Sequence, residues 1–528
     1  MNYLNINTPL INFSKVLNED IYVDKSLLID TLNPIIGRSS RYICITRPRR
    51  FGKTTNANML GAYYTTGYDS HELFDGLAVS QTDNYNDNIN KHHVFYIDMG
   101  FTPQFCGSFQ EYIYSIYEKL MSDIIEMKPE LAHKKFFSLS DALFATGETF
   151  IFILDEWDYI FNKDFMTEAA KNKYLEFLRG LLKDQPYVEL AYMTGVLPIA
   201  KYSSGSELNM FREYNFMNDY VFEKYFGFSE DEVKDLCRNH MDISFETLKQ
   251  WYDGYYMSDG SSLFNPRSVS CALNDGVCLN YWTETGPMNE IAECIEHNVD
   301  EVREDIVKMV AGIPVEVDLQ GYSASELQLD TRDEILSAMV VYGFLSYHEG
   351  YLRIPNYELM EKFQRVLTRN SMGDIKAIVE RSKAMLKATL EGDAQTVAEI
   401  LEYVHDQEIP FLKYNDENAL SCVITLCYLY ARKDYSIERE AKSGKGYCDY
   451  LFNPKKHGMP AIILELKVDG SCDDALNQIK RRNYIQKVEH SNKVLMVGIN
   501  YDRVDKRHEC KIEEIGWDAY AQRGHQEY

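Results

Sequence analysis

One stretch of the chain, residues 41–64 (RYICITRPRRFGKTTNANMLGAYY), constrains the fold more than any other. A β-type run at 42–45 leads into a basic turn that ends at Gly52, and a predicted helix begins at Lys53. Strand, glycine turn and helix are the parts of a phosphate-binding loop, in which backbone N–H groups and the helix N-terminus hold a polyphosphate. The pattern G-x-x-x-x-G-K-[ST] requires glycine where this chain has Arg47, so the interpretation needs support from other parts of the chain.

The turn and the start of the helix supply the candidate nucleotide-binding residues. In such a loop the lysine, here Lys53, reaches the β- and γ-phosphates, and the hydroxyl of Thr54 holds Mg²⁺. The predicted ligand is ATP with Mg²⁺. The candidate binding residues are Arg49, Arg50, Phe51, Gly52, Lys53, Thr54 and Thr55.

A second signal is the run TFIFILDEWD at 149–158, about a hundred residues downstream. Its continuous apolar part predicts a strand buried on both faces of a parallel sheet, and its carboxylates follow where ligands bind in open α/β sheets. Asp155 is the candidate Mg²⁺ ligand, and Glu156 is the candidate catalytic residue that polarises the attacking water. The alternative is a buried strand with an acidic turn, but the upstream Lys-Thr pair favours a nucleotide site.

Two further β-type runs complete a predicted α/β module with a mostly parallel sheet. They lie at 93–98 and 188–195, and they alternate with predicted helices at 109–127 and 167–184. Thr194 is expected at the carboxyl end of its strand. There it either senses the γ-phosphate or caps the strand, and the sequence leaves both roles open.

The composition limits the classes of function. The chain has 528 residues, enough for about three or four domains, and its net charge of -26 disfavours indiscriminate binding to nucleic acid or to an anionic membrane. Its eleven cysteines are scattered without a C-x-x-C pair, which predicts reduced thiols in a cytoplasmic protein. The N-terminus lacks the pattern of a signal peptide, and the longest apolar run, around 336–347, is too short to span a bilayer. No membrane partner is expected.

A second group of candidate residues lies near the C-terminus, on predicted strands at 447–452 and 461–467. Asp449 and Glu465 are expected on neighbouring strands, where both can hold a divalent ion, and Lys467 lies on the same side of its strand as Glu465. Hard oxygen ligands suit Mg²⁺ or Mn²⁺, and the ammonium can orient a water or stabilise phosphate charge. These three candidate catalytic residues form the D…E-x-K pattern of the PD-(D/E)XK nucleases. The alternative is an exposed Glu–Lys ion pair on an edge strand.

A further carboxylate would complete this metal site, and Glu417 and Glu438 are both open candidates for it. Glu417 begins a predicted apolar helix. The proline that names the motif is absent, because Cys448 precedes the aspartate, and Tyr447 stands where the pattern G-R-x-D has arginine.

The quoted motifs together resemble one family. TRPRRFGKT, FILDEWD and YMTGVLPIAKYSSGSELNMF are similar to bacterial AAA-ATPase-like proteins that carry a C-terminal PD-(D/E)XK nuclease-like domain. In that family the loop has the form R-P-R-R-F-G-K-[ST], so Arg47 is the family's own form, and Trp157 stands where the family has tyrosine. The resemblance extends from about residue 22 to the C-terminus. It implies a P-loop ATPase of the AAA/STAND-like kind, and Gln478 with Tyr484 matches the family's Q-I-x-x-x-x-Y tail.

The predicted fold is α/β: a P-loop NTPase parallel sheet, a helical middle region and a C-terminal α/β domain of the restriction-endonuclease-like kind. The predicted divisions are a P-loop AAA-ATPase-like domain at 1–220, a helical lid that could include a winged-helix-like element at 221–372, a helical connector at 373–412 and the nuclease-like domain at 413–528. Arg267, in the lid, either contacts phosphate or forms a surface or core pair, and the second is the commoner role of an arginine.

Two functions remain open at this stage. The first is an ATP-dependent enzyme that processes DNA or RNA, which the retained Asp449, Glu465 and Lys467 favour. The second is a non-catalytic, ATP-dependent switch of the STAND type with an inactive nuclease fold, which the acidic charge favours slightly. Either could be a homo-oligomer. The arginines of the loop either neutralise phosphates or contact a partner subunit, or else pair with the acidic segment at 155–158, and we favour the first group of roles for at least one of them.

Overall fold

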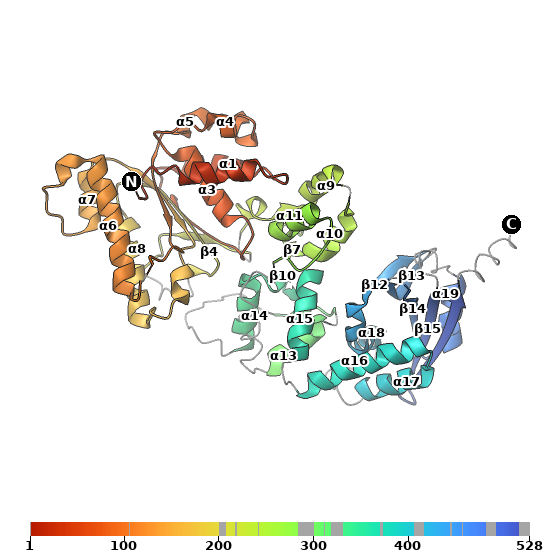
Figure 1. Cartoon of the computed structure of the whole chain (residues 1–528). Coiled ribbons are helices and arrows are strands. Elements are labelled where there is room, and N and C mark those ends of the chain that lie inside the picture. The colour runs from red at the N-terminus through yellow and green to blue at the C-terminus, as the bar shows by residue number, and fades with distance from the viewer. Residues whose placement is uncertain are drawn as a thin grey trace. The chain divides into compact units, whose positions relative to one another are not determined.

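The computed structural model describes residues 2–104, 106–199, 207–216, 219–240, 242–282, 300–310, 312–317, 331–369, 373–405, 417–443, 446–456, 458–481 and 493–516. The chain falls into two compact units, Met1–Arg303 with Glu316–Met360 and Glu304–Val315 with Glu361–Tyr528. The finer four-part division stays a prediction. Figure 1 shows the elements along the chain.

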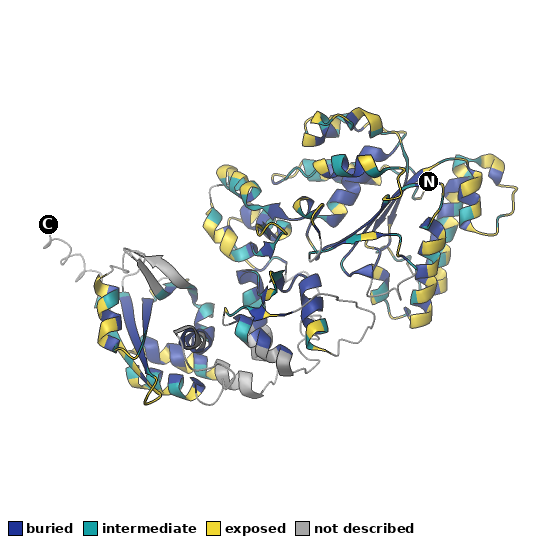
Figure 2. Ribbon diagram, turned by 180° about the vertical axis from the view of Figure 1, so that it is seen from behind, coloured by how far each residue is buried: buried dark blue, intermediate teal, exposed yellow. Residues whose placement is uncertain are grey.

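The first unit is built on a five-stranded sheet in which every neighbouring pair is parallel, in the order β2-β3-β4-β1-β5. Because β4 lies between β1 and β3, the end of β4 separates the predicted phosphate loop from the predicted acidic strand end. The side chains of β1 and β3 are buried throughout (Figure 2), as a parallel sheet covered on both faces requires. The strands are β1 Tyr42–Thr46, β2 His93–Asp98, β3 Phe150–Asp155, β4 Val188–Gly195 and β5 Arg212–Tyr214.

Helices cover both faces of this sheet (Figure 1). Alternate residues of β1 enter different cores, because successive side chains of a strand point to opposite faces. Ile43 packs in the core that includes residues of α1 and α3, and Cys44 packs in the core that includes residues of α6 and α8. The helices of this part are α1 Thr8–Leu17, α2 Leu27–Leu32, α3 Lys53–Tyr64, α4 His71–Phe74, α5 Tyr85–Asn88, α6 Phe109–Met127, α7 Leu139–Ala145 and α8 Glu168–Leu182.

The middle of the chain is mostly helical, with two small sheets. Its helices are α9 Glu230–Asn239, α10 Phe245–Tyr252, α11 Pro266–Asp275, α13 Asp300–Val310, α14 Arg332–Val341 and α15 Tyr357–Arg369. Its short strands are β6 Phe228–Ser229, β7 Tyr255–Tyr256, β8 Ser262–Phe264, β9 Val315–Glu316, β10 Ser346–His348 and β11 Tyr351–Arg353. Helix α14 precedes the antiparallel hairpin β10–β11, and whether this makes a winged-helix element stays a prediction.

The second unit contains a mixed five-stranded sheet whose strands follow one another in the order of the sequence. Strands β14 and β15 are parallel and the other neighbours are antiparallel. Helix α19 packs its apolar side against this sheet. The strands are β12 Tyr435–Ser443, β13 Gly446–Pro454, β14 Ala461–Val468, β15 Lys493–Asp502 and β16 Arg507–Gly516, and the helices are α16 Gly373–Glu391, α17 Ala394–Tyr403, α18 Glu417–Cys427 and α19 Cys472–Arg481.

The fold has the class that the sequence predicts, α/β with a P-loop-type parallel sheet and a second, mixed sheet at the C-terminal end. None of the helices in the described ranges is both long and apolar enough to cross a membrane.

Candidate nucleotide and metal sites

The predicted phosphate loop connects β1 to α3, as the sequence indicates. Its backbone takes the left-handed conformation at Arg50 (φ 72°) and at Gly52 (φ 86°), which turns the chain sharply into the helix. The ammonium of Lys53 donates hydrogen bonds of 2.8 Å to the carbonyl oxygens of Arg47 and Pro48. Burial lowers the pKa of Lys53 to about 8, although the charges of Asp158 and other carboxylates oppose this change. A phosphate oxygen that replaced the two carbonyls would restore a full counter-charge to the lysine.

Arg47 has a structural role that the sequence did not indicate. Its guanidinium is buried, it donates hydrogen bonds to the carbonyl oxygens of Thr46 (2.8 Å) and Tyr214 (3.0 Å), and it pairs with the carboxylate of Asp219. Asp219 also accepts hydrogen bonds from the backbone N–H groups of Val221 (2.8 Å) and Phe222 (2.7 Å). The carboxylate that pairs with Arg47 therefore lies outside the segment 155–158 and is not a phosphate. The arginine ties the start of the loop to the end of β5 and to the chain that follows it.

Replacing Asp219 with alanine should destabilise the first unit by about 3 kcal/mol or more, because the buried Arg47 would lose its counter-charge. Urea denaturation measures this change. Asp231→Ala is the matched control, since Asp231 is exposed and its removal should alter stability little. Equal stability of the two variants would show that the Arg47 charge finds another partner.

The acidic strand end lies across the end of β4 from the loop, at the carboxyl edge of the sheet. Thr194, at the end of β4, donates a short hydrogen bond to the Asp155 carboxylate, and its hydroxyl accepts one from the Glu156 N–H at 3.3 Å. Asp98 lies opposite Asp155 in the register of β2 and β3. Burial, then Asp155, then Asp98 raise the pKa of Glu156, so this carboxylate accepts a proton more readily than an exposed one.

Glu156 is held in an uncommon backbone conformation (φ 53°). A side chain at Gly100 would place its Cβ 2.5 Å from Oε2 of Glu156, so the glycine leaves the room that the carboxylate occupies. Asp98 and Gly100 were not singled out from the sequence. The signal for Asp98 was present, since it ends a strand parallel to the one that ends at Asp155.

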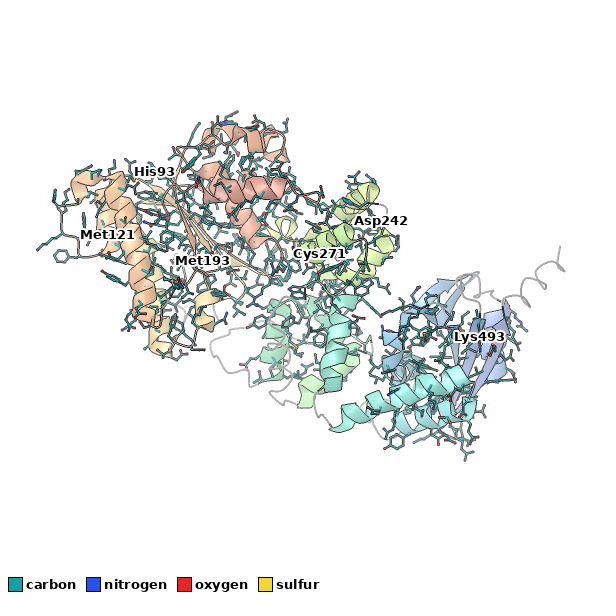
Figure 3. The ribbon with its side chains drawn as sticks, viewed as in Figure 1. His93, Met121, Met193, Asp242, Cys271 and Lys493 are labelled. Carbon is teal, nitrogen blue, oxygen red and sulfur yellow. The ribbon has the colours of Figure 1, made fainter. Side chains whose placement is uncertain are left out.

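A cleft of about 660 Å³ opens above the loop, a volume within the range of ligand pockets. All seven predicted loop residues line it, together with Glu156, whereas Asp155 and Thr194 do not. Arg267 also lines it, from the first turn of α11, the helix on which Figure 3 labels Cys271. The remaining lining includes apolar side chains such as Val23 and Phe228, which sequence reasoning did not assign to the site.

The second candidate site lies on β13 and β14, which are paired neighbours, as the sequence predicts for Asp449 and Glu465. The Asp449 carboxylate accepts a hydrogen bond of 2.6 Å from the backbone N–H of Leu466. Lys467 donates to Oε1 of Glu465 at 3.3 Å, and the amide of Gln478, on α19, donates a short hydrogen bond to the same oxygen. The described geometry thus brings four of the predicted residues together.

Burial and a neighbouring negative charge both act on the Glu465 carboxylate. Its side chain is buried, and burial together with the Asp449 charge raises its pKa to about 7, while Lys467 opposes the change. Its second oxygen, Oε2, is buried and receives no hydrogen bond from the described residues. Buried carboxylate oxygens are normally satisfied. A divalent ion held by Glu465 and Asp449 would satisfy this oxygen, so the residues fit Mg²⁺ or Mn²⁺.

Of the two candidates for a third metal-binding carboxylate, Glu417 and Glu438, the side chain of Glu438 is described. Glu438 lies on β12, opposite Leu451 of β13. Its carboxylate accepts a hydrogen bond of 3.2 Å from the amide of Asn453, which is two residues beyond Leu451, whereas Asp449 is two residues before it. The side chain of Glu417 and the whole of Tyr484 lie outside the described residues. Within the described part of the chain, no group of three or more His, Cys, Asp and Glu side chains is arranged to hold a metal.

Comparison with known proteins finds a family match within each unit. Residues 9–204 match the family described as a predicted AAA-ATPase, and residues 415–510 match the PD-(D/E)XK nuclease superfamily. The first match contains Lys53 and Asp155, and the second contains Asp449, Glu465 and Lys467. No curated protein matches the chain.

Two solved structures show a distant likeness. A Walker-type ATPase of Pyrococcus abyssi is 13% identical, with 66% of this chain and 97% of that one covered and a TM-score of 0.34. The ORC2 protein of Aeropyrum pernix, solved in ADPNP–ADP complexes, is 11% identical, with 69% and 98% covered and a TM-score of 0.29. The family matches confirm the architecture that the motifs predict: the chain carries an AAA-ATPase-like domain at its N-terminal end and a PD-(D/E)XK nuclease superfamily domain at its C-terminal end.

Proposed function

We propose that this chain binds and hydrolyses ATP at the loop after β1, and that its second unit cleaves nucleic acid with the help of a divalent ion. The observation that carries the nuclease half is the buried Oε2 of Glu465, which no described hydrogen bond satisfies. It belongs to a carboxylate whose other oxygen accepts a hydrogen bond from Lys467 and which lies within range of the Asp449 charge. An inactive remnant of such a fold has no need to bury an unsatisfied carboxylate oxygen, since doing so costs stability.

The chemistry follows from these groups. A bound Mg²⁺ would supply positive charge and a more acidic water. Asp449 and Glu465 would hold the ion through their oxygens. Lys467 would keep its ammonium beside the scissile phosphate, where negative charge accumulates during attack. Gln478 donates to Oε1 of Glu465, so Oε2 would be the oxygen available to hold the ion.

For the first unit the support is the cleft itself. Seven loop residues and Glu156 line one cavity whose volume suits a nucleotide, and Lys53 is held there by carbonyl oxygens that a phosphate can replace. The ligand we assign is ATP with Mg²⁺ at Thr54 and Asp155, and the polymers we assign to the second unit are DNA or RNA.

A cleavage panel tests the proposal. Single- and double-stranded DNA and RNA are incubated with the chain and Mg²⁺ or Mn²⁺, with and without ATP, and an EDTA sample serves as the control. We expect cleavage of at least one polymer that requires the metal and changes with ATP. A panel without cleavage under any condition would favour the alternative, an ATP-dependent switch of the STAND type, which the net charge of -26 already favours slightly.

A further inference from the structure

Two cavities of the first unit share one wall. The first is the cleft of about 660 Å³ over the loop, and the second is a small chamber of about 30 Å³ behind it. Four residues line both: Arg49, Lys53, Glu156 and Tyr159. They include the lysine assigned to the phosphates and the carboxylate assigned to the attacking water. These shared residues therefore lie at the boundary between the space for the nucleotide and the chamber.

The chamber suits a water molecule. A cavity needs at least about 10–15 Å³ and two to four polar partners to hold one, and this chamber has more than that volume. Its polar lining includes Glu156, Asp158 and Asn162, and Leu197 and Tyr342 contribute apolar atoms. A water held there would lie next to the carboxylate that accepts its proton, at the lining that the chamber shares with the nucleotide cleft.

Arg49 is the loop arginine that reaches both spaces. The guanidinium of Arg47 is held by Asp219, and Arg50 lines the cleft but not the chamber. The charge of Arg49 also adds to burial in lowering the pKa of Lys53, which places the two cations close to each other. Lys53 also lies among the charges of Asp158, Asp155 and Glu156, and a terminal phosphate bound at Lys53 would place a further negative charge next to Arg49.

We propose that Arg49 is a catalytic residue of the proposed ATPase, supplied by the same chain that binds the nucleotide. The oxygen of the water in the chamber attacks the γ-phosphorus and forms a new P–O bond. Glu156 accepts the proton of the water. The bond between the γ-phosphorus and the β–γ bridging oxygen breaks, and ADP leaves with the electron pair. Arg49 neutralises the charge that develops on the γ-phosphoryl oxygens, so a single chain holds a complete hydrolytic site.

An arginine that stabilises this transition state contributes far more to the rate than to ground-state binding. Arg49→Ala should therefore lower kcat for ATP hydrolysis about 1,000-fold and leave the affinity for ADP within about threefold of wild type. The rate per wild-type chain should stay constant when the protein is diluted. Arg38→Ala, which removes an exposed arginine at the other end of the sheet, is the control and should keep the wild-type rate.

Three results would overturn the inference. One is a wild-type rate per chain that rises with protein concentration, since a partner would then supply a catalytic group. A second is a normal kcat in Arg49→Ala. A third is an equal loss of ADP affinity and of rate, because Arg49 would then act in binding alone.

The inference rests on the proposed ATPase, and a transition-state analogue separates the two. The affinity for ADP with tetrafluoroaluminate is measured in wild type and in Arg49→Ala. If the wild type binds ATP but does not hydrolyse it, the proposed ATPase fails, but the analogue still tests the role of Arg49. Tighter binding of the analogue by the wild type than by Arg49→Ala supports that role. Equal binding by the two proteins contradicts it. If the wild type binds no nucleotide, both fail.

Discussion

Replacing Lys53 with alanine should lower the affinity for ATP roughly 100-fold, because a charged donor would be lost from the phosphates at the loop. The wild-type ammonium is already desolvated and held by two backbone carbonyl oxygens at 2.8 Å. Most of the free-energy cost of desolvating this cation is therefore incurred during folding and not when the phosphate binds. Titration calorimetry with ATP and with ADP measures the change, and both affinities should fall.

The control for this variant is Lys91→Ala, which removes a lysine that donates a hydrogen bond to the nearby carbonyl oxygen of Asn86. It should keep the wild-type affinity. Thermal unfolding of both variants checks that the loop persists, since Lys53→Ala also leaves the carbonyls of Arg47 and Pro48 without their donor. Tight ATP binding by a folded Lys53→Ala protein would place the nucleotide somewhere other than this loop.

The place of a residue in the fold can be predicted from the sequence where a regular pattern determines it. Lys53 and Glu156 lie at the ends of parallel strands or at the start of the helix that follows, and all parallel strands of one sheet end at one edge. Asp449 and Glu465 lie at positions that strand periodicity places on one side of adjacent strands. The proximity of such side chains can be predicted from the sequence because the geometry of helices and strands is nearly fixed.

The positions that the sequence did not predict depend on irregular segments. Asp219, the partner of Arg47, lies far along the chain in a stretch without periodicity, so no spacing rule connects the two. The shared wall between cleft and chamber includes Tyr159, from the turn after β3, whose direction only the folded backbone determines. Likewise the pattern E-x-K predicts that Glu465 and Lys467 share a side, but it does not predict that one oxygen of Glu465 is left unsatisfied.

Glu465→Gln should abolish metal-dependent cleavage, with a loss of about 1,000-fold or more, because the amide removes the charge that holds the ion and preserves the shape of the side chain. The affinity of the second unit for Mn²⁺, measured by calorimetry on the full chain, should fall together with the cleavage rate. Glu514→Gln on β16 is the control, since Glu514 is exposed and pairs only with Lys493 in the described structure. Full cleavage by Glu465→Gln would remove this residue from the reaction.

The same residue makes the second unit's behaviour depend on pH in two linked ways. A metal must displace the proton of Glu465, whose pKa is raised to about 7, so Mn²⁺ affinity should rise steeply up to about pH 7 and level off above it. Without metal, the free energy of unfolding should change with pH in the opposite direction. The folded state binds a proton that the unfolded state has already lost, so stability falls between about pH 4.5 and pH 7.

Glutamine carries no charge at any pH in this window. The substitution should therefore abolish cleavage but raise the stability of the metal-free protein. In the absence of metal, Glu465→Gln should be more stable than the wild type by about 3 kcal/mol at about pH 8, and the two proteins should be nearly equal at about pH 4. Urea denaturation at the two pH values measures the difference. A gap that did not grow with pH would mean that the wild-type carboxylate is already neutralised by a protein cation, which would leave no excess negative charge for a metal to balance.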